Sequence, residues 1–298
     1  MKKVKIITDS CSDLGGKLLE KYNIDYAKMA TVEDGNQIPA LVTWTEEEAH
    51  ELYEKIRAGK RITTTQVPVE EFQRIFTQYA EEGCDIVYIG CSSKQSGSVN
   101  TGFVTAKKIM EQYPDCKIFC IDALNASIGE GLLAIEAAKK AEEGACAQEI
   151  SDYIISIRKT VNQYLTLHSL DTLKRSGRIS ATSAFFGNLM GVKPILISDK
   201  NGAQAAYKKV KGRGAALKEI VALMKASIVN PENQTIYLWH SDCEKDELDQ
   251  VSEIIKNEIP NCKDIEIGYI GPIIGASIGP SVIGVWAFGN EVTFEAKA

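Results

Sequence analysis

An alternation of short apolar runs with helix-like segments constrains the first half of this chain more than any other feature. Strand-like runs cover residues 4–7, 26–32 and 86–89, a further run ends at Asp122, and segments with an apolar period of about 3.6 residues follow them. Alternating strands and helices over about 145 residues are typical of a parallel sheet with helices on both faces. The first half is therefore predicted to be an α/β domain.

Chain length and a change of sequence pattern predict a second domain. At 298 residues the chain is too long for one small core. Beyond the first half, residues 169–198 indicate two helices followed by a strand, and residues 199–214 indicate a hairpin with an Asn-Gly turn. We predict an N-terminal parallel-sheet α/β domain over residues 1–160 and a C-terminal mixed-sheet α/β domain over residues 161–298.

Composition excludes several classes of partner. Hydrophobic residues make up 44% and charged residues 25% of the chain, as in ordinary globular proteins, and the net charge of −6 supplies no general positive field. Nucleic acids and anionic membrane surfaces are therefore not expected as partners. The eight cysteines form no CxxC pair and the amino terminus has no long apolar stretch, which together indicate the reducing cytoplasm.

Two further patterns argue against a metal centre and a membrane span. His50, His168 and His240 have no metal-ligand spacing to another histidine, cysteine or carboxylate, so neither a zinc site nor a cofactor is predicted. Residues 267–290 carry no charge and are long enough to cross a bilayer, but their glycines and prolines would interrupt a helix. We expect buried strands joined by a tight turn there, and no stable membrane insertion.

Hydroxyl side chains gather in the loop that follows the strand-like run at residues 86–89. Residues 85–110 indicate a strand, a loop and a helix. Serines and glycine at such a turn place hydroxyl groups and free backbone N–H groups at a helix N-terminus, where the partial positive charge favours an anion. The alternative is that one serine only caps the helix. The loop residues of interest are Ser92, Ser93, Ser96, Gly97 and Ser98.

A second group of hydroxyls precedes another predicted helix. The threonines at 63–65 stand before a helix predicted over residues 69–81, and three of them are more than capping requires, which suggests a functional role. The alternative is that one caps the helix while the others face solvent. Asp9 ends the first strand, which is where open α/β sheets build their sites, although a turn-forming role explains it equally well. Ser12 or Asp13 is expected to cap the helix that follows.

Basic residues of the C-terminal half concentrate in two places, which suggests a local anionic partner in an acidic chain. Solvated lysines are the simpler interpretation of both groups. Arg178 is the stronger candidate for a directed contact, because its planar guanidinium binds oxyanions through two parallel hydrogen bonds. The groups are Lys174, Arg175 and Arg178 around the sequence SGRIS, and Lys208, Lys209, Lys211 and Arg213 around the hairpin.

Ser277 and Cys91 are possible nucleophiles of an enzyme, but the sequence places no histidine where it could act as their general base. The sequence GASIG places Ser277 in a G-x-S-x-G pattern, but the last histidine, His240, precedes the serine, whereas this type of hydrolase has its histidine after it. Cys91 lies in the hydroxyl loop and likewise has no histidine near it in the sequence. Catalysis by this chain is therefore not expected, and an enzyme acting on an acyl or phosphorylated small molecule is the alternative.

An ordered set of motifs resembles the DegV family of bacterial fatty-acid-binding proteins across essentially the whole chain. In order, the motifs are TDSCSDL, TTTQVPVEEF, CSSKQSGSVNTG, LKRSGRIS, GNLMGVKPIL and IGPIIGASIGPSVIG. The resemblance implies a two-domain α/β protein that holds one long-chain fatty acid in a buried tunnel, between the domains and into the second. It also implies a carrier in phospholipid metabolism that presents the acyl chain to a separate ATP-dependent fatty acid kinase.

The resemblance implies ligand-binding roles for individual residues. Thr64 matches the threonine of the family's TSQP motif, which hydrogen-bonds the carboxylate, and Ser96 matches the serine of the family's hydroxyl loop. Thr65 and Gly97 adjoin these two residues and are expected to line the same site. Ser277 stands where many members have a histidine, and it is expected to contact the ligand as well.

The resemblance also implies contacts to a phosphate or to the kinase. Arg178 matches an arginine of the family's GGRIS turn that is assigned to such a contact. Lys211 replaces an arginine of the family's hairpin, and Arg213 stands two residues further on. Lys211 keeps the positive charge but not the planar fork. These departures, together with Ser277, bear more on kinase partnership than on lipid binding.

Overall fold

The computed structural model describes residues 2–180 and 191–296. The chain divides into two compact units, each of which gathers separate stretches of sequence. Unit 1 comprises Met1–Trp44, Ile62–Arg158 and Gly271–Ile273, and unit 2 comprises Thr45–Arg61, Lys159–Ile270 and Ile274–Ala298. The predicted domains, residues 1–160 and 161–298, are each one continuous stretch and stay a prediction. No pattern in the sequence indicates that residues 45–61 group with unit 2.

Unit 1 contains the predicted parallel sheet. Its strands are β1 (Val4–Asp9), β2 (Asp25–Ala27), β6 (Asp85–Gly90) and β7 (Ile118–Asp122), in the spatial order β2-β1-β6-β7. All three pairings are parallel. Every residue of β6 is buried, as expected of a central strand covered on both faces. The predicted α/β fold is therefore confirmed.

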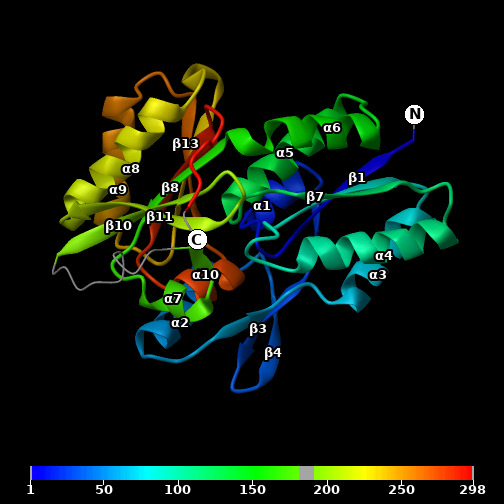
Figure 1. Ribbon diagram of the computed structural model, residues 1–298, viewed down its shortest axis with the longest axis horizontal. Coiled ribbons are helices and arrows are strands. Elements are labelled where there is room, and N and C mark those ends of the chain that lie inside the picture. The colour runs from blue at the N-terminus through cyan, green and yellow to red at the C-terminus, as the bar shows by residue number, and fades with distance from the viewer. Residues whose placement is uncertain (1, 181–190, 297–298) are drawn as a thin grey trace. The chain divides into compact units, whose positions relative to one another are not determined.

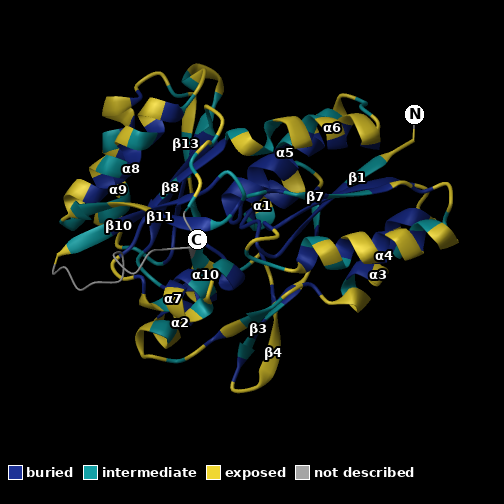
Figure 2. Cartoon of the chain, in the orientation of Figure 1, coloured by how far each residue is buried: buried dark blue, intermediate teal, exposed yellow. Residues whose placement is uncertain are grey.

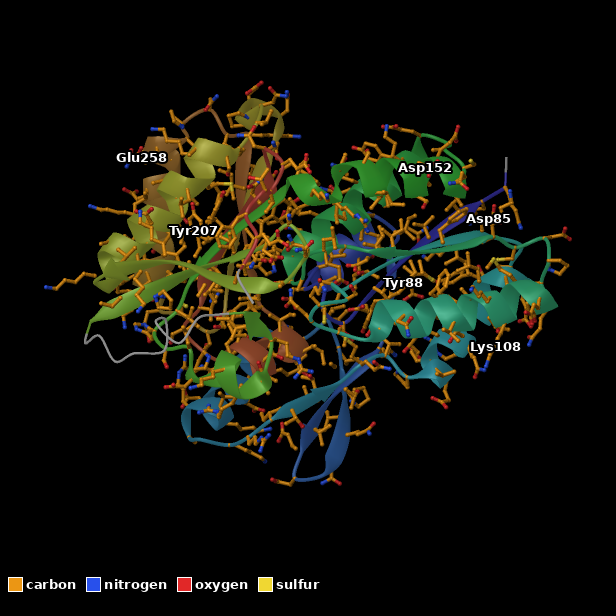
Figure 3. All side chains as sticks on the ribbon, viewed as in Figure 1. Asp85, Tyr88, Lys108, Asp152, Tyr207 and Glu258 are labelled. Atoms are coloured by element: carbon orange, nitrogen blue, oxygen red, sulfur yellow. The ribbon has the colours of Figure 1, made fainter. Side chains whose placement is uncertain are left out.

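Helices cover both faces of this sheet (Figure 1). On one side lie α5 (Ile128–Glu142) and α6 (Ala147–Ile157), and on the other α3 (Val69–Glu81) and α4 (Ser98–Gln112). Figure 2 shows that α3 and α4 turn exposed residues outward and buried residues toward the strands. Phe72 of α3 packs edge-on against Tyr88 of β6 with ring centroids 5.0 Å apart (Tyr88 in Figure 3). This aromatic contact anchors α3 to the central strand.

A second, three-stranded sheet in unit 1 corrects two expectations. The single strand expected over residues 26–32 is divided, because β2 ends at Ala27 and β3 (Met29–Glu33) pairs instead with β4 (Asn36–Ala40) and β5 (Thr63–Thr65). The threonines therefore form a strand and cap no helix; the residue before α3 is Pro68, which has no side-chain donor or acceptor. The short helix α1 (Gly15–Lys21) links β1 to β2.

Unit 2 contains the predicted mixed sheet, with antiparallel and parallel pairs in one layer. Strands β10 and β11 form the predicted hairpin, and Gly202 in its turn has φ +83°, a conformation that favours glycine. The order is β13-β12-β14-β8-β10-β11-β9. The strands are β8 (Val161–Thr166), β9 (Ile179–Ser180), β10 (Val192–Ser198), β11 (Gln204–Lys211), β12 (Thr235–His240), β13 (Asp264–Tyr269) and β14 (Ile283–Phe288).

Two long helices of unit 2, α8 (Arg213–Ser227) and α9 (Lys245–Glu258), form its apolar core with the sheet. Fully buried residues of α8, among them Ile220, pack with Val285 of β14 in this core. Among the described residues, unit 2 also contains α2 (Glu46–Arg57), which begins with a capping box between Thr45 and Glu48, and α7 (Asp171–Ser176). Short 3₁₀ turns cover Arg158–Thr160 and Pro231–Asn233.

The uncharged segment at residues 267–290 differs from its expected form. A short helix, α10 (Pro272–Ile278), separates β13 from β14 where a tight turn between strands was expected. Pro272 occupies its first position, where a missing N–H costs little. Within the described residues, no helix combines the length and the apolar character that crossing a membrane requires. The second helix expected within residues 169–198 falls on residues 181–190, outside the described residues.

Candidate functional site

The strand order of unit 1 places its functional loops at one edge of the sheet. The chain leaves β1 toward β2 on one side and returns to β6 on the other, so the topology switches between β1 and β6. Ligands of open α/β sheets bind beyond the carboxyl ends of the strands at such a point. The segments that follow β1, β6 and β7 carry Asp9, Cys91 and Ser127, respectively, at or just beyond these ends.

The loop after β6 is a compact turn that places Ser96 beside the N-terminus of α4. The backbone N–H of Ser96 donates to the carbonyl of Ser92 over 3.0 Å. The hydroxyl oxygen of Ser96 accepts from the backbone N–H of Ser98 over 3.2 Å and lies 2.9 Å from the Ser98 hydroxyl. Gly97 occupies the cap position of α4 itself. Ser96 therefore assists the helix start while staying half-exposed.

The two residues that follow β5, Gln66 and Val67, lie against the start of α4, although some thirty residues separate them in the sequence. The backbone N–H of Val67 donates to the Ser98 hydroxyl over 3.2 Å, and the Gln66 amide donates to the Thr101 hydroxyl over 2.9 Å. A methyl group added at Gly97 would lie 2.1 Å from the Gln66 Oε1 atom. We call β5 together with the 92–98 loop the hydroxyl edge.

The neighbouring threonines of β5 have different environments. The Thr65 hydroxyl accepts from the backbone N–H of Ala30 over 3.2 Å, so it helps to pair β5 with β3. Thr64 is half-buried, and within the described part of the chain its hydroxyl makes no hydrogen bond. Of these two threonines, Thr64 is therefore the one whose side chain is available to a ligand. The predicted ligand roles of Thr64, Thr65, Ser96 and Gly97 stay predictions.

A buried acidic group lies at the switch point behind these loops. The Asp9 carboxylate accepts from the Tyr88 hydroxyl over 2.7 Å and from the backbone N–H groups of Cys11 and Cys91 over 2.9 and 3.2 Å. The Thr8 hydroxyl donates to Glu130 Oε1 over 2.7 Å. Burial raises the pKa of both carboxyl groups.

Asp13 joins the same region and does not cap α1 as expected. Its carboxylate accepts from the Ser127 hydroxyl and, over 2.8 Å, from the backbone N–H of Gly271. Burial raises the pKa of Asp13 to about 8. Ser12, the other expected cap, makes no side-chain hydrogen bond within the described residues. Asp13 thus connects three chain segments of unit 1.

Sequence reasoning singled out Asp9 but missed Asp13 and Glu130 as buried acids. One signal was present for Glu130: it is a lone acid in the otherwise apolar start of a helix, between Gly129 and Gly131, and all of its neighbours there are buried. No such signal marked Asp13, because its partners Ser127 and Gly271 are remote in the sequence.

The remaining predicted residues belong to unit 2, and Arg213 has a structural role there. Its guanidinium forms a bidentate ion pair with Glu247, at 2.9 and 3.1 Å, and donates to the carbonyl of Ser281 over 3.1 Å. Lys211 is exposed at the end of β11. Arg178 is exposed as well, and its guanidinium donates to the nearby carbonyl of Ser176.

Ser277 lies inside α10 and not at a strand-to-helix turn, so the GASIG sequence does not form a nucleophile elbow. Burial lowers the pKa of His240 to about 4, and its Nδ1 atom accepts from the backbone N–H of Cys243 over 3.2 Å. His50 pairs with Asp242 over 3.0 Å. The geometry thus gives no support to a serine hydrolase.

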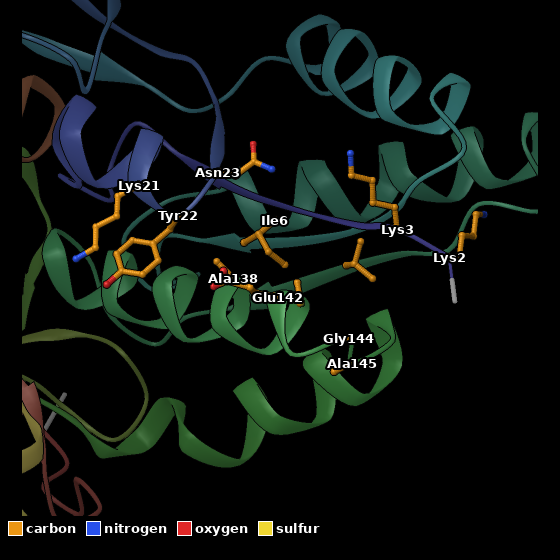
Figure 4. A pocket seen from close by; sticks show the side chains of 12 residues that line it. Lys2, Lys3, Ile6, Lys21, Tyr22, Asn23, Ala138, Glu142, Gly144 and Ala145 are labelled. Atoms are coloured by element: carbon orange, nitrogen blue, oxygen red, sulfur yellow. The ribbon is translucent and has the colours of Figure 1, made fainter.

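A hollow elsewhere in unit 1 contains none of the predicted site residues (Figure 4). It has a volume of about 470 Å³ and lies between the amino-terminal end of β1 and the carboxyl-terminal end of α5. Three lysines, Lys2, Lys3 and Lys21, contribute to its wall beside Ala138 and Ala141. This hollow is at the opposite end of β1 from Asp9 and the switch point.

Comparisons with known proteins find relatives over the full length of the chain. The family model described as "Uncharacterised protein, DegV family" matches residues 3–290. A DegV domain-containing protein of Clostridium perfringens is 34% identical over 290 residues, which cover 97% of this chain and 99% of the relative.

Two solved structures from Thermotoga maritima are also similar. One is a DegV lipid binding protein with 27% identity and a TM-score of 0.81, covering 98% of this chain and all of that chain. The other is a hypothetical protein described as having a fatty acid binding function, with 26% identity and a TM-score of 0.80, covering 97% of this chain and all of that chain.

Proposed function

This chain belongs to the DegV family, and from that premise we propose that it binds a long-chain fatty acid by its carboxylate at the hydroxyl edge. Thr64 and Ser96 hold the carboxylate, with Thr65 and Gly97 beside them. The chain is a binding protein and carries out no reaction on the lipid. Relatives that are described as lipid-binding or fatty-acid-binding, at 26–27% identity over nearly the whole chain, support the proposal.

The observation that carries the proposal is the half-buried Thr64 hydroxyl, unbonded within the described residues, on a strand fixed against the N-terminus of α4. Ser96 supplies a second hydroxyl at that helix end, where the partial positive charge favours an anion. Hydrogen bonds to a charged acceptor are about twice as strong as neutral ones, so two hydroxyls and a helix end can orient a carboxylate without a buried lysine or arginine.

Apolar burial supplies most of the affinity. A chain of about sixteen carbons, at ~0.8 kcal/mol for each buried CH₂ group, contributes on the order of 10 kcal/mol before the costs of ordering. The head-group contacts then select for a free acid over a neutral lipid, because a buried hydroxyl left without its partner costs about 1–3 kcal/mol.

The carrier role extends this proposal to a second protein. A carboxylate held only by hydroxyls and backbone groups stays chemically unchanged until a partner acts on it. Arg178 and Lys211 are exposed on unit 2 and are suited to contact an acidic or phosphorylated group. We assign them to a fatty acid kinase subunit, which would phosphorylate the bound lipid.

The kinase assignment has its own test. Bound fatty acid is incubated with ATP and a purified fatty acid kinase subunit, and acyl phosphate is measured with wild type and with Arg178→Ala. The carrier role predicts turnover that depends on this chain and falls in the variant at unchanged lipid affinity. Lipid binding without any phosphorylation would limit the chain to storage or regulation.

Fatty acid binding itself is tested by denaturing mass spectrometry of an organic extract of the purified, folded protein. We expect about one acyl chain of roughly 14 to 18 carbons for each protein chain. A folded preparation that contains no such lipid and takes none up from solution would refute the proposal.

A further inference from the structure

Two thiols and a carboxylate meet in the interior of unit 1, beside the hydroxyl edge and outside the proposed lipid contacts. The Sγ atoms of Cys11 and Cys91 and one carboxylate oxygen of Glu130 all lie within 4.8 Å of one another. All three side chains are buried. Cys11 follows β1, Cys91 follows β6 and Glu130 lies in the first turn of α5, so the fold and not the local sequence brings them together.

Asp9 fixes the positions of all three residues. Its carboxylate accepts from the backbone N–H groups of Cys11 and Cys91, and its own backbone N–H lies 3.4 Å from Glu130 Oε1. The Thr8 hydroxyl donates to the same Glu130 oxygen. Carboxylates and hydroxyls that orient ligating side chains from behind are a regular part of metal sites.

The second oxygen of Glu130 is the independent observation that points to a ligand. Among the described residues, Glu130 Oε2 is buried and has no hydrogen-bond partner. A buried carboxylate oxygen without a partner is costly, and buried charges in proteins are paired or coordinate metals. Two thiol sulfurs lie within 4.8 Å of one oxygen of this carboxylate, and neutral thiols are only weak hydrogen-bond donors.

We propose that Cys11, Cys91 and Glu130 form a binding site for one zinc ion. The three donor atoms lie within 4.8 Å of one another. Tetrahedral Zn²⁺ with Zn–S bonds of about 2.3 Å holds two sulfurs about 3.8 Å apart, a separation that lies within this limit. The Glu130 carboxylate oxygen suits Zn²⁺, whereas Cu⁺ takes thiolate and thioether ligands. The Met29 sulfur lies 3.5 Å from Cys11 Sγ, so Cu⁺ is the competing ion that the metal analysis has to distinguish. Each thiol that coordinates the ion as a thiolate releases its proton to the solvent.

This site differs from the sequence-based expectation of no zinc centre for a specific reason. That expectation rested on the lack of metal-ligand spacing between the histidines and another histidine, cysteine or carboxylate. Here each ligand comes from a different βα unit of the parallel sheet, so no spacing rule applies.

The test begins with the metal content of the chain purified without chelator. Because the ligands are buried, a second preparation is refolded in the presence of Co²⁺, which replaces Zn²⁺ and reports thiolate ligands through a charge-transfer absorption band. We expect about one zinc ion per chain as purified, and a Co²⁺–thiolate band after refolding.

Three variants separate coordination from packing. Cys91→Ala removes a thiolate, and Glu130→Gln keeps an acceptor for Thr8 but removes the charge; each should weaken metal binding more than about 10-fold, since even second-shell partners contribute 10–100-fold. Cys116→Ala is the matched control, because Cys116 is a buried cysteine of the same unit outside the cluster. Circular dichroism establishes that each variant is folded.

Two results would overturn the site. One is a folded wild-type protein with no zinc as purified and no Co²⁺–thiolate band after refolding. The other is metal binding that survives unchanged in folded Cys91→Ala and Glu130→Gln. Lipid content is measured on the same samples, so loss of the metal and loss of the fatty acid are distinguished.

Discussion

Thr64 and Thr65 are neighbours on β5, but their side chains have different roles. Successive residues of a strand point to opposite faces, so Thr64 and Thr65 cannot share an environment. Thr65 is bonded to the backbone of β3, whereas Thr64 has an unbonded hydroxyl within the described residues. A run of threonines thus supplies one ligand group and one structural group.

Replacing the Thr64 hydroxyl isolates its contact with the lipid. Thr64→Val keeps the shape and the β-branched preference for a strand, and should weaken fatty acid binding roughly 10- to 100-fold, because a hydrogen bond to a charged group contributes about 1.5–3 kcal/mol. Isothermal titration with hexadecanoic acid measures the change. Thr63→Val, at an exposed position of the same strand, is the control and should leave the affinity within about twofold. Equal effects of the two substitutions would remove Thr64 from the site.

Arg213 should matter for the stability of unit 2. Arg213→Met leaves Glu247 and the Ser281 carbonyl without their donor, which should lower the free energy of unfolding by about 1–3 kcal/mol. Urea denaturation measures this loss. Lys211→Met, at an exposed position, should change stability by less than about 0.5 kcal/mol. If Arg213 instead served only to contact a partner, Arg213→Met would keep the free energy of unfolding of the wild type and would weaken binding of the partner.

The same ion pair has a defined pH dependence. Hydrogen bonds and charge from Arg213 lower the pKa of Glu247 below its ordinary value of 4.5. Stability from a lowered carboxyl pKa is present above the ordinary value and is lost as pH falls through the lower folded-state value. The stability gap between wild type and Arg213→Met should therefore be constant above pH 4.5 and close as the pH falls further. If the difference in stability between wild type and Arg213→Met stays constant as the pH falls below 4.5, the destabilisation by Arg213→Met comes from lost packing and not from the ion pair.

At the scale of elements, one serine joins β5 to α4. The buried Ser98 hydroxyl accepts from the backbone N–H of Val67, itself fully buried. Ser98→Ala leaves that donor unpaired and should cost about 1–3 kcal/mol of stability. It should also weaken fatty acid binding, although Ser98 is not assigned to the carboxylate, because β5 loses its attachment to the helix end. Ser93→Ala, in the exposed part of the loop, is the control, and unaltered affinity in a destabilised Ser98→Ala would contradict the coupling.

The elements of unit 1 were largely predictable, because its helices and strands carry clear periodicities. The helix of residues 69–81 places Phe72, Ile75, Phe76 and Tyr79 on one buried face, so its pattern and its environment agree. The exceptions depend on tertiary context. The break after Ala27 moves β3 into a different sheet, and α10 forms where glycine and proline content argued against a helix. Local sequence does not encode which sheet a strand joins.

For the molecule as a whole, bound lipid should stabilise the folded chain by mass action. A ligand that binds only the native state at about 100 times its Kd adds ~2.7 kcal/mol to the free energy of unfolding. Delipidated protein should therefore melt at a lower temperature than protein with added hexadecanoic acid. Hexadecan-1-ol, which keeps the chain but has no charge, should restore less of the stability. An equal restoration by the alcohol would mean that the carboxylate is not recognised.

The candidate site was only partly accessible from the sequence. Hydroxyl loops at the ends of strands were visible, since small polar residues between periodic segments mark them, and the structure brings β5 and the 92–98 loop together. The buried acids and thiols were not visible as a group. Cys11, Cys91 and Glu130 come together because the parallel sheet aligns the carboxyl ends of β1, β6 and β7, which these residues follow.

The most direct test of lipid binding at the hydroxyl edge is a crystal structure of the chain with its bound fatty acid. We expect electron density for a carboxylate within hydrogen-bond distance of the Thr64 and Ser96 hydroxyls, about 2.5–3.0 Å. Density for the carboxylate at any other position, with both hydroxyls bonded only to water or protein, would contradict this expectation.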